Sequence, residues 1–490
     1  MTEEISIHRQ GRLKKLNDMQ EMGYNPYPYS FKPNAYAADL QEKYKDLANG
    51  EHTEDRVIVA GRAMAVRNDG MFIDLKDKSG SIQVFCHKCN LDENNLKLLK
   101  CLDLGDMIGV HGFIRRTPRG ELSVAAEKFD IIAKSLEPLP EKFHGLTDMD
   151  TRYRQRYVDF IINDEAKETF RTRCKMVSAI REYLSGEDFM EVETPILHPI
   201  MGGASAKPFV THYNALDNDF YLRVAPELYL KKLIVSGFDR VFEIGRNFRN
   251  EGIDKNHNPE FTALEVYMAY GDYNDGAELI SNIIRYAALK VFGKEQFEVD
   301  GKIVDVSKPF PKVSMIDLIK QNCGIDFLQA QTVEEAREMA QSVGVEASHC
   351  SCWGKVVTEV FDEKVEHTLF EPIHVMDMPR DVSPLAKTHR NNPRLVEHFD
   401  TYIAGMEIAC SYSELSNPLE QRERFMDQMK AREEGDDEAQ MLDESFLDAL
   451  DHGFAPTTGL GMGMDRLAKL MTNSATLRDV IAFPTLKVKK

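Results

Sequence analysis

The chain has 490 residues, of which 42% are hydrophobic and 29% are charged. This length predicts two or three domains of a globular protein. No apolar run of about 18 residues occurs, so we expect no membrane span. The N-terminus resembles neither a secretory signal nor a transit peptide, which favours a cytoplasmic protein. The net charge of −19 argues against indiscriminate nucleic-acid binding, but it leaves room for a specific RNA partner on a local basic surface.

The eight cysteines are scattered along the chain. The close pairs Cys86/Cys89 and Cys350/Cys352 have no partner pair or histidine cluster at a zinc-site spacing, which favours plain reduced thiols. Three groups of basic residues are candidates for a local binding surface, although each alone is more often a solvated face. These groups are Arg9, Arg12, Lys14 and Lys15; Arg115, Arg116 and Arg119; and Lys487, Lys489 and Lys490.

Residues 1–54 predict a helical N-terminal extension. Residues 3–22 carry Leu13, Leu16 and Met19 at three-residue spacing, which is typical of an amphipathic helix. Gly23 is placed to cap the C-terminus of this helix.

Residues 55–135 predict a small β domain. Short β-rich runs alternate there with turn sequences such as Asn68-Asp69-Gly70. A five-stranded barrel of this size ahead of another domain suggests an OB-fold, although the strand pattern alone fits any compact β domain. Residues 136–150 contain two prolines and are interpreted as a linker.

Two segments further along carry unusual arginine and glycine patterns. The first runs from Phe242 to Gly252 and continues through His257 to Thr262, and the second covers residues 459–466. Alternate side chains of a strand share a face, which groups Glu243, Asn247 and Arg249 on one side of the first segment. Phe261, Ala263, Glu265, Tyr267 and Ala269 share a face of the returning strand. For an isolated arginine, a structural ion pair is the simpler explanation.

These segments resemble motifs 2 and 3 of the class II aminoacyl-tRNA synthetases, and the sequence around them is similar to the lysine-specific branch. Residues 190–195 follow a predicted helix over 164–185 and resemble motif 1, which forms the dimer interface in that family. The resemblance covers nearly the whole chain. The implied fold is α+β and multidomain, with an N-terminal OB-fold β-barrel for anticodon binding and a class II catalytic domain. The catalytic domain, residues 151–490, is expected to have an antiparallel sheet flanked by helices, with a helical insertion at about 308–366.

The resemblance implies ATP-dependent attachment of lysine to tRNA(Lys) through a lysyl-adenylate, with release of AMP and pyrophosphate. Adenylate formation needs the amino-acid carboxylate in line with the α-phosphate of ATP and needs the developing charge neutralised. By resemblance, Arg249 bridges carboxylate and α-phosphate, and Arg466 holds the γ-phosphate. The residues implied for ATP binding are Arg249, Glu251, His257, Asn258, Phe261, Glu407 and Arg466.

Asp400 and Glu407 match the family's metal-binding carboxylates, and Mg²⁺ prefers such oxygen ligands. Simple strand alternation puts the two on opposite faces, so a bulge or a twist is required to bring them together. The implied partners are lysine, ATP, tRNA(Lys) and a second copy of the chain.

A buried cationic substrate needs carboxylates. We expect Glu414 to meet the ε-ammonium of lysine, and Glu227 or Glu265 to meet its α-ammonium. Cys410 departs from the family, which usually carries Asn there; because cysteine is a weak hydrogen bonder, a lower lysine affinity or another amino acid stays open. The residues implied for the amino-acid site are Gly203, Glu227, Glu265, Tyr267, Cys410, Tyr412, Glu414 and Gly461.

In the β domain, Phe72 and Gln83 match the aromatic and amide positions that read the middle anticodon uridine, since a Phe face stacks on a base and an amide bonds its pairing edge. Arg67 is a further candidate. Glu127 lies one residue out of register with the family's uridine-contacting glutamate.

Two other readings remain. A paralogue that lysylates a protein side chain generally lacks the β domain, which residues 55–133 supply here. A catalytically inactive homologue has no chemical need for the full set of Arg249, Arg466, Asp400 and Glu407.

Overall fold

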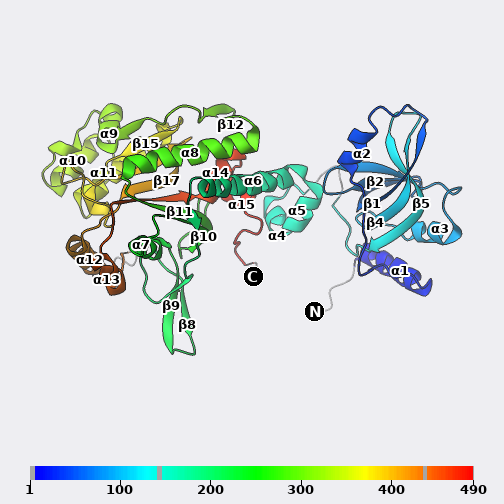
Figure 1. Cartoon of the computed structure of the whole chain (residues 1–490), viewed down its shortest axis with the longest axis horizontal. Helices are drawn as coiled ribbons and strands as arrows, with labels where there is room; N and C mark the ends of the chain where they lie inside the picture. Colours follow the sequence, from blue (N-terminus) through cyan, green and yellow to red (C-terminus); the bar gives the residue numbers. More distant parts are fainter. Residues whose placement is uncertain (1–5, 141–145, 434–438, 489–490) are drawn as a thin grey trace. The chain divides into compact units, whose positions relative to one another are not determined.

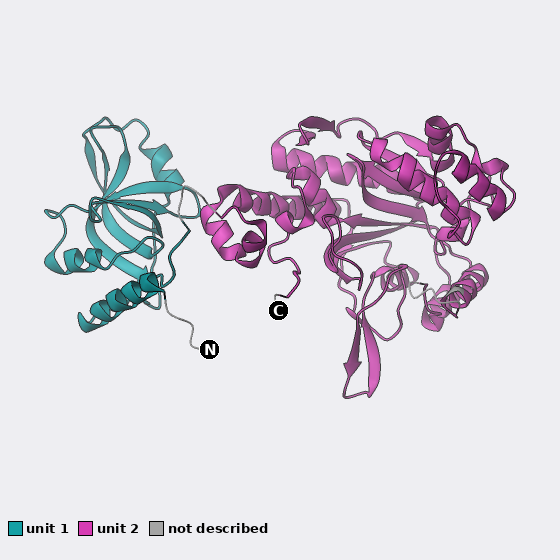
Figure 2. Cartoon of the chain, turned by 180° about the vertical axis from the view of Figure 1, so that it is seen from behind, with its two compact units in different colours: residues 1–145 teal, residues 146–490 magenta. Residues whose placement is uncertain are grey.

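The computed structural model describes residues 6–140, 146–433 and 439–488. The chain divides into two compact units, residues 1–145 and 146–490, which are coloured teal and magenta in Figure 2. Among the described residues, no helix combines the length and apolar character needed to cross a membrane. The first residues of the predicted N-terminal helix and the basic residues Lys489 and Lys490 lie outside the described residues.

The smaller unit is built on a closed five-stranded barrel with strand order β1-β2-β3-β5-β4, which confirms the predicted β-barrel (Figure 1). The strands are β1 (His52–Arg67), β2 (Phe72–Lys76), β3 (Ser81–Phe85), β4 (Met107–Arg116) and β5 (Leu122–Ala133), with helices α2 (Ala37–Lys43) and α3 (Glu93–Lys100) beside them. Alternate residues of β2 and β3 are buried, so each strand keeps one face in the barrel core and one face outside. The predicted turn is present, since Asn68, Asp69 and Gly70 all have positive φ.

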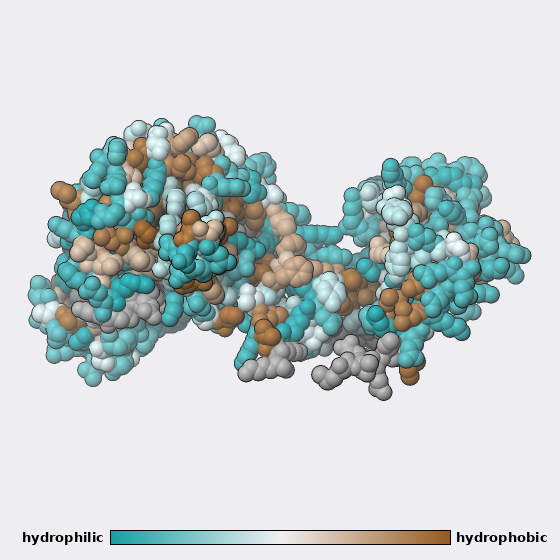
Figure 3. Space-filling view, turned by 90° about the horizontal axis from the view of Figure 1, so that it is seen from below, coloured by the Kyte–Doolittle hydropathy of each residue, from teal (hydrophilic) through white to brown (hydrophobic). Residues whose placement is uncertain are grey.

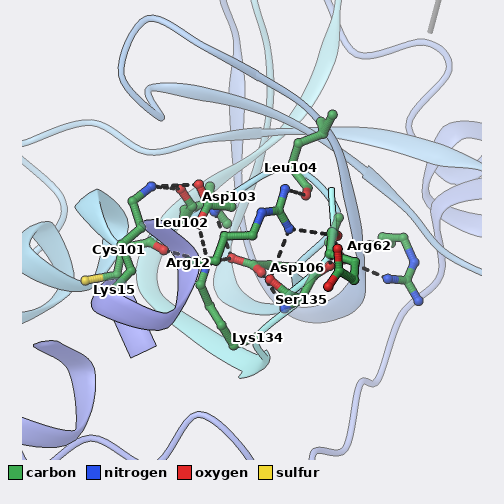
Figure 4. Close-up of polar contacts among 12 residues, drawn as sticks. Arg12, Lys15, Arg62, Cys101, Leu102, Asp103, Leu104, Asp106, Lys134 and Ser135 are labelled. Carbon is green, nitrogen blue, oxygen red and sulfur yellow. Dashed lines mark hydrogen bonds and ion pairs between the residues drawn. The ribbon is translucent and has the colours of Figure 1, made fainter. Parts of the chain in front are cut away.

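Helix α1 (Ile7–Glu21) attaches to this barrel through polar contacts as well as through Met19. Arg12 is only 8% exposed, and its guanidinium donates to the backbone oxygens of Leu104 and Ser135 (Figure 4) and of Glu137. Lys15 Nζ lies 2.7 Å from Asp103 Oδ1. Of the first basic group, Arg12 is therefore buried and Lys15 is paired with a carboxylate, whereas Lys14 is exposed.

A buried ion-pair group continues this network. Lys134 Nζ lies 2.6 Å from Asp103 Oδ2 and 2.7 Å from Asp106 Oδ2, and the side chains of Lys134 and Asp106 are fully buried. Asp106 Oδ1 also accepts from the backbone N–H of Ser135 at 2.7 Å. The network joins α1 and the chain directly after β5 to the loop before β4 (Figure 4).

The larger unit is organised around an eight-stranded sheet, mostly antiparallel, with β6 parallel to β10 and β14 parallel to β15 at its edges. Helices α6 (Asp164–Gly186), α8 (Tyr273–Phe292) and α14 (Met464–Met471) share one apolar core with it. In sheet order the strands are β14 (Lys312–Ser314), β15 (Ile373–Met376), β16 (His398–Ile403), β17 (Met406–Ser413), β18 (Thr457–Gly463), β11 (Glu260–Ala269), β10 (Arg240–Phe248) and β6 (Met190–Glu191). The arrangement confirms the predicted α+β class.

The predicted insertion contains helices α9 (Met315–Cys323), α10 (Val333–Ser342) and α11 (Trp353–Lys364), which gather around a second apolar core. Thr332 Oγ1 accepts from the backbone N–H of Glu335 at 3.2 Å and so caps α10. The segment is not purely helical, because β14 lies within it and extends the main sheet.

The remaining elements lie around the sheet and the helices that cover it; β12, for example, lies beside α8 and α14 (Figure 1). They are α4 (Met149–Arg154), α5 (Arg156–Ile162), β7 (Leu197–His198), β8 (Val210–Tyr213), β9 (Asn218–Leu222), α7 (Glu227–Val235), β12 (Gln296–Val299), β13 (Lys302–Asp305), α12 (Pro418–Glu433), α13 (Glu444–Asp451) and α15 (Leu477–Val480).

The bulge required by the sequence is present between β16 and β17. Thr401 pairs with Ala409, but Tyr402 pairs with Glu407, so one extra residue of β17 is inserted. Ile408 and Ala409 are both buried. Because the insertion interrupts the alternation, Glu407 returns to the face that carries Asp400.

Candidate active site

Two adjoining cavities lie on the face of the sheet formed by β10, β11, β17 and β18. Their volumes of about 270 and 200 Å³ together reach the roughly 300–1,000 Å³ of small-molecule sites. Arg249, Glu265, Cys410 and Gly461 line both cavities. The first, called here the amino-acid cavity, also includes Gly203, Glu227, Tyr267 and Tyr412. The second, called the nucleotide cavity, also includes Glu251, His257, Asn258, Phe261, Glu407 and Arg466. Of the residues predicted for the amino-acid, ATP and metal sites, Asp400 and Glu414 line neither cavity.

Arg249 stands at the junction of the cavities, directly after β10. Its guanidinium carbon lies 5.1 Å from the Phe261 ring centroid, and its Nε has no hydrogen-bond partner among the described residues. Glu243 of β10 instead pairs with Arg223, whose Nη1 lies 2.5 Å from Glu243 Oε1. Because Arg249 lines both cavities, its side chain can contact a ligand in either of them.

The outer end of the nucleotide cavity is held by Arg466. Its Nη1 donates at 3.0 Å to the carboxylate of Glu407, and its Nη2 lies 3.4 Å from His257 Nε2. The neighbouring Asp465 accepts from the backbone N–H of Thr262 and from Arg173 of α6. Direct contacts thus join the segment that resembles motif 3 to the segment that resembles motif 2 and to helix α6.

A fully buried lysine, absent from the residues predicted above, lies behind the amino-acid cavity. Lys231 Nζ lies 2.6 Å from Glu227 Oε1 and 2.5 Å from Glu414 Oε2. Glu414 Oε1 has no hydrogen-bond partner among the described residues and lies directly over Gly459, where the Cβ of any other residue would collide with it. Glu414 therefore lies in the second layer of the cavity wall, and its direct contact with a ligand stays a prediction.

Glu265 is the carboxylate shared by both cavities. Burial raises its pKa to about 8, and the nearby charge of Glu227 acts in the same direction. The Tyr267 hydroxyl donates to Glu265 Oε2 at 3.2 Å. An added ammonium group would stabilise the ionised form of this carboxyl group.

Excess negative charge gathers beside the nucleotide cavity. Burial raises the pKa of Asp362 to about 7, and the charges of Glu366, Glu359, Asp400 and Glu407 raise it further. A divalent cation would relieve this repulsion, and carboxylate oxygens suit Mg²⁺. Asp400 and Glu407 on their common face are therefore a fitting donor pair for this ion.

Cys410 stands opposite Asp400 in the β16–β17 pairing. Burial raises the pKa of its thiol well above the usual value, and the charges of Asp400 and Glu407 act in the same direction. At the junction of the two cavities, Cys410 therefore presents a neutral thiol, where the resemblance to the family led us to expect the side-chain amide of Asn.

The outer face of the barrel carries the predicted anticodon residues. Phe72 and Gln83 lie on this face of the paired strands β2 and β3, and Ser123 donates to Gln83 Oε1 at 2.9 Å. Phe85, which sequence reasoning missed, lies 5.2 Å from Phe72 between ring centroids. The Arg115 guanidinium lies 4.5 Å from the Phe85 centroid. Gln83 and Phe85 are two residues apart on β3, so their side chains lie on the same face of the strand. This spacing could have identified Phe85 from the sequence.

Arg67 and Glu127 are both engaged within the barrel. Arg67 makes two hydrogen bonds to the carboxylate of Asp74, at 2.6 and 2.8 Å. Glu127 lies in a β-bulge, because His111 pairs with Lys128 while Gly112 pairs with Ala126. Its carboxylate is 2.8 Å from Arg56 Nε. The extra residue in this bulge shifts the pairing of β5 by one position at Glu127. The sequence comparison had likewise placed Glu127 one residue away from the family's glutamate.

Comparison with known proteins decides the family. Residues 148–487 match the model of the class II tRNA synthetases (D, K and N), and residues 57–132 match the OB-fold nucleic-acid-binding domain. The chain belongs to the class II tRNA synthetases. It is 50% identical to a Sinorhizobium medicae protein named lysine–tRNA ligase, over 98% of this chain and 96% of that protein.

Other relatives of this synthetase carry the same name. A Nostoc protein is 49% identical over 98% of this chain and 87% of its own length. A Carboxydothermus hydrogenoformans protein is 46% identical over 97% of each chain. The synthetase is thus similar over nearly its whole length to proteins of the same name from several organisms.

Proposed function

We propose that the chain is a lysine–tRNA ligase. It activates lysine with ATP to form lysyl-adenylate and pyrophosphate, and it then transfers the lysyl group to a terminal ribose hydroxyl of tRNA(Lys), releasing AMP. The observation that carries this proposal is the junction of the two cavities, where Arg249 and Glu265 face both. The names of the relatives support the same reaction. We also propose that it acts in the cytoplasm.

Lysine is favoured by the charges around the amino-acid cavity. Glu227, Glu265 and Glu414 supply three carboxyl groups, whereas Lys231 and Arg249 supply two cations. A lysine ligand adds two ammonium groups and one carboxylate, so the set becomes neutral when all the groups are ionised. An acidic or amide side chain would leave the carboxylates uncompensated in a buried place.

Activation depends on orientation and on fixed positive charge. Arg249 would hold the amino-acid carboxylate against the α-phosphate and stabilise the charge that develops there. Phe261 would stack on adenine while Glu251 and Asn258 bond it, and Arg466 with His257 would hold the outer phosphates. Bound Mg²⁺ would neutralise phosphate charge. Asp400 and Glu407 would hold this ion, and Arg466 would exchange its contact with Glu407 for the γ-phosphate.

Phe72 and Gln83 would read the anticodon, by stacking under a base and by hydrogen bonding to its edge.

A homodimer through the motif 1 segment is supported by exposed apolar residues. Met190 of this segment is 43% exposed, and Ile196 and Leu197, which directly follow it, are 45% and 48% exposed. Apolar side chains reach the surface of the larger unit in several patches (Figure 3). Contact with a second copy would bury this segment.

The first test is amino-acid-dependent ATP–pyrophosphate exchange with Mg²⁺, comparing lysine with every other standard amino acid. We expect strong exchange with lysine alone. Arg249→Ala should lower the exchange rate about 100- to 1,000-fold, as expected for loss of one fixed charge-stabilising donor.

The matched control is Arg240→Ala. Arg240 lies at the other end of β10 and also stands over a phenylalanine ring, 5.2 Å from the Phe189 centroid, but it lines neither cavity. Its variant should exchange at the wild-type rate. Exchange with a different amino acid, or full activity of Arg249→Ala, would contradict the proposed function.

A further inference from the structure

His398, Asp400 and Cys410 converge on one face of the main sheet. His398 and Asp400 are two residues apart on β16, so their side chains project to the same side. Cys410 is the cross-strand partner of Asp400 on β17. A ring nitrogen, a carboxylate oxygen and the thiol sulfur of these three residues all lie within 4.8 Å of one another. Two paired strands thus hold three different metal-ligand atoms together.

The spacing of two of these atoms fits a tetrahedral ion. His398 Nε2 lies 3.3 Å from Asp400 Oδ1, and Nε2 has no hydrogen-bond partner among the described residues. Zinc bonds of roughly 2.0–2.1 Å to nitrogen and oxygen set a tetrahedral edge of about 3.3 Å. The gap therefore matches the separation of two ligands on one ion.

The histidine ring is already oriented for such a role. Its Nδ1 lies 2.9 Å from Ser383 Oγ, and its ring makes an edge contact with Tyr412 at 5.2 Å between centroids. Metal-bound histidines commonly donate their other ring N–H to a neighbouring oxygen, which fixes the ring. Ser383 can accept that hydrogen bond while Nε2 faces Asp400.

We propose that His398, Asp400 and Cys410 form a binding site for a thiophilic divalent cation of the Zn²⁺ type. Sulfur and imidazole ligands select such an ion over Mg²⁺, which prefers oxygen alone. His398 and Cys410 also line the amino-acid cavity, so the fourth position of a tetrahedron opens toward that cavity. The asparagine usual at position 410 in this family offers no sulfur.

Occupation of this site inhibits amino-acid activation. Asp400 belongs both to this triad and to the pair assigned to Mg²⁺, so a bound Zn²⁺ competes with Mg²⁺ for the negative charge of this carboxylate. The ion also stands at the wall of the amino-acid cavity. This consequence rests on the proposed function, whereas the binding of the ion does not.

The test uses Co²⁺ as a spectroscopic probe on the full-length, metal-free protein. We expect one equivalent to produce the intense near-ultraviolet thiolate-to-cobalt absorption and the visible bands of a tetrahedral ion, and Zn²⁺ to displace it. Cys410→Asn should abolish the thiolate band and weaken binding, and His398→Ala should weaken binding ~10- to 100-fold. A second group, His349, Cys350 and Glu359, is the internal control. Cys350→Ser should leave the signal intact.

Absence of a thiolate–cobalt band in the wild-type protein would overturn the proposal, as would a band that survives in Cys410→Asn and disappears in Cys350→Ser. ATP–pyrophosphate exchange provides the second readout. Low Zn²⁺ should inhibit exchange by the wild type at concentrations that do not inhibit exchange by Cys410→Asn. If exchange were absent without zinc in both proteins, the proposed function would fail while the cobalt result still decided the metal site.

Discussion

At the scale of single residues, Glu265 makes lysine binding depend on pH. Its pKa of about 8 in the unliganded protein means that the carboxyl group is mostly protonated at neutral pH. A bound ammonium group favours the ionised form and lowers this pKa, so lysine binding releases a proton. Lysine affinity should therefore rise as the pH rises toward 8. We expect the KM for lysine in the exchange reaction to fall by up to about tenfold per unit between pH 6 and 8.

Two comparisons isolate this effect. Glu265→Gln cannot ionise, so its KM for lysine should be higher and nearly flat over the same range. The KM for ATP measured in the same reactions should lack the steep trend. A pH-independent KM for lysine in the wild-type protein would contradict the assignment of Glu265 to an ammonium group.

Most residues of the candidate site were predictable because they belong to continuous sequence motifs. Lys231 was not predicted, since a lysine on an amphipathic helix is usually exposed. Its spacing of four residues from Glu227 was a usable sign of an ion pair. Its contact with Glu414, almost two hundred positions away, depends on the packing of α7 against the sheet and could not be read from the sequence.

At the scale of elements, local patterns predicted where helices and strands lie but missed how polar contacts attach them. The spacing of Leu13, Leu16 and Met19 predicts an apolar face for α1. In the structure Arg12 and Met19 are the buried residues, and the two leucines are only half-buried. The Arg12 guanidinium donates hydrogen bonds to backbone oxygens that lie far away in the sequence. The spacing of apolar residues within a helix cannot predict such acceptors. The β16–β17 bulge, by contrast, was foreseeable because two carboxylates had to share a face.

Arg12 should therefore control the docking of α1. Arg12→Ala removes hydrogen bonds from a charged donor to three backbone oxygens, which should cost roughly 1.5–3 kcal/mol of local stability. The measurement is amide hydrogen exchange of residues 7–21, which should become roughly 10- to 100-fold faster. Exchange in the core strands of the barrel should change much less.

Lys14→Ala is the matched control, because Lys14 is exposed on the same helix. Its variant should exchange like the wild type. Equal protection of α1 in the Arg12→Ala and wild-type proteins would show that Met19 and the other apolar contacts alone hold the helix.

At the scale of the whole molecule, the proposed function assigns recognition and chemistry to different units. Both cavities lie entirely in the larger unit, and Phe72 and Gln83 lie in the smaller one. Composition and motifs predicted this division, since a β-rich region precedes the motif-bearing region in the chain. Pyrophosphate exchange requires only amino acid and ATP, so the barrel should be dispensable for that half-reaction and necessary for efficient tRNA charging.

Phe72→Ala tests this separation. Loss of one stacked base should cost about 1–3 kcal/mol, which raises the KM for tRNA(Lys) roughly 5- to 150-fold. Lysine-dependent exchange should keep its wild-type rate, because Phe72 lies outside both cavities. Tyr29→Ala, which removes a fully exposed aromatic ring from the same unit, should change neither reaction. An equal loss of exchange and charging in Phe72→Ala would mean that the barrel supports the chemistry of the larger unit, and unchanged charging would remove Phe72 from the anticodon interface.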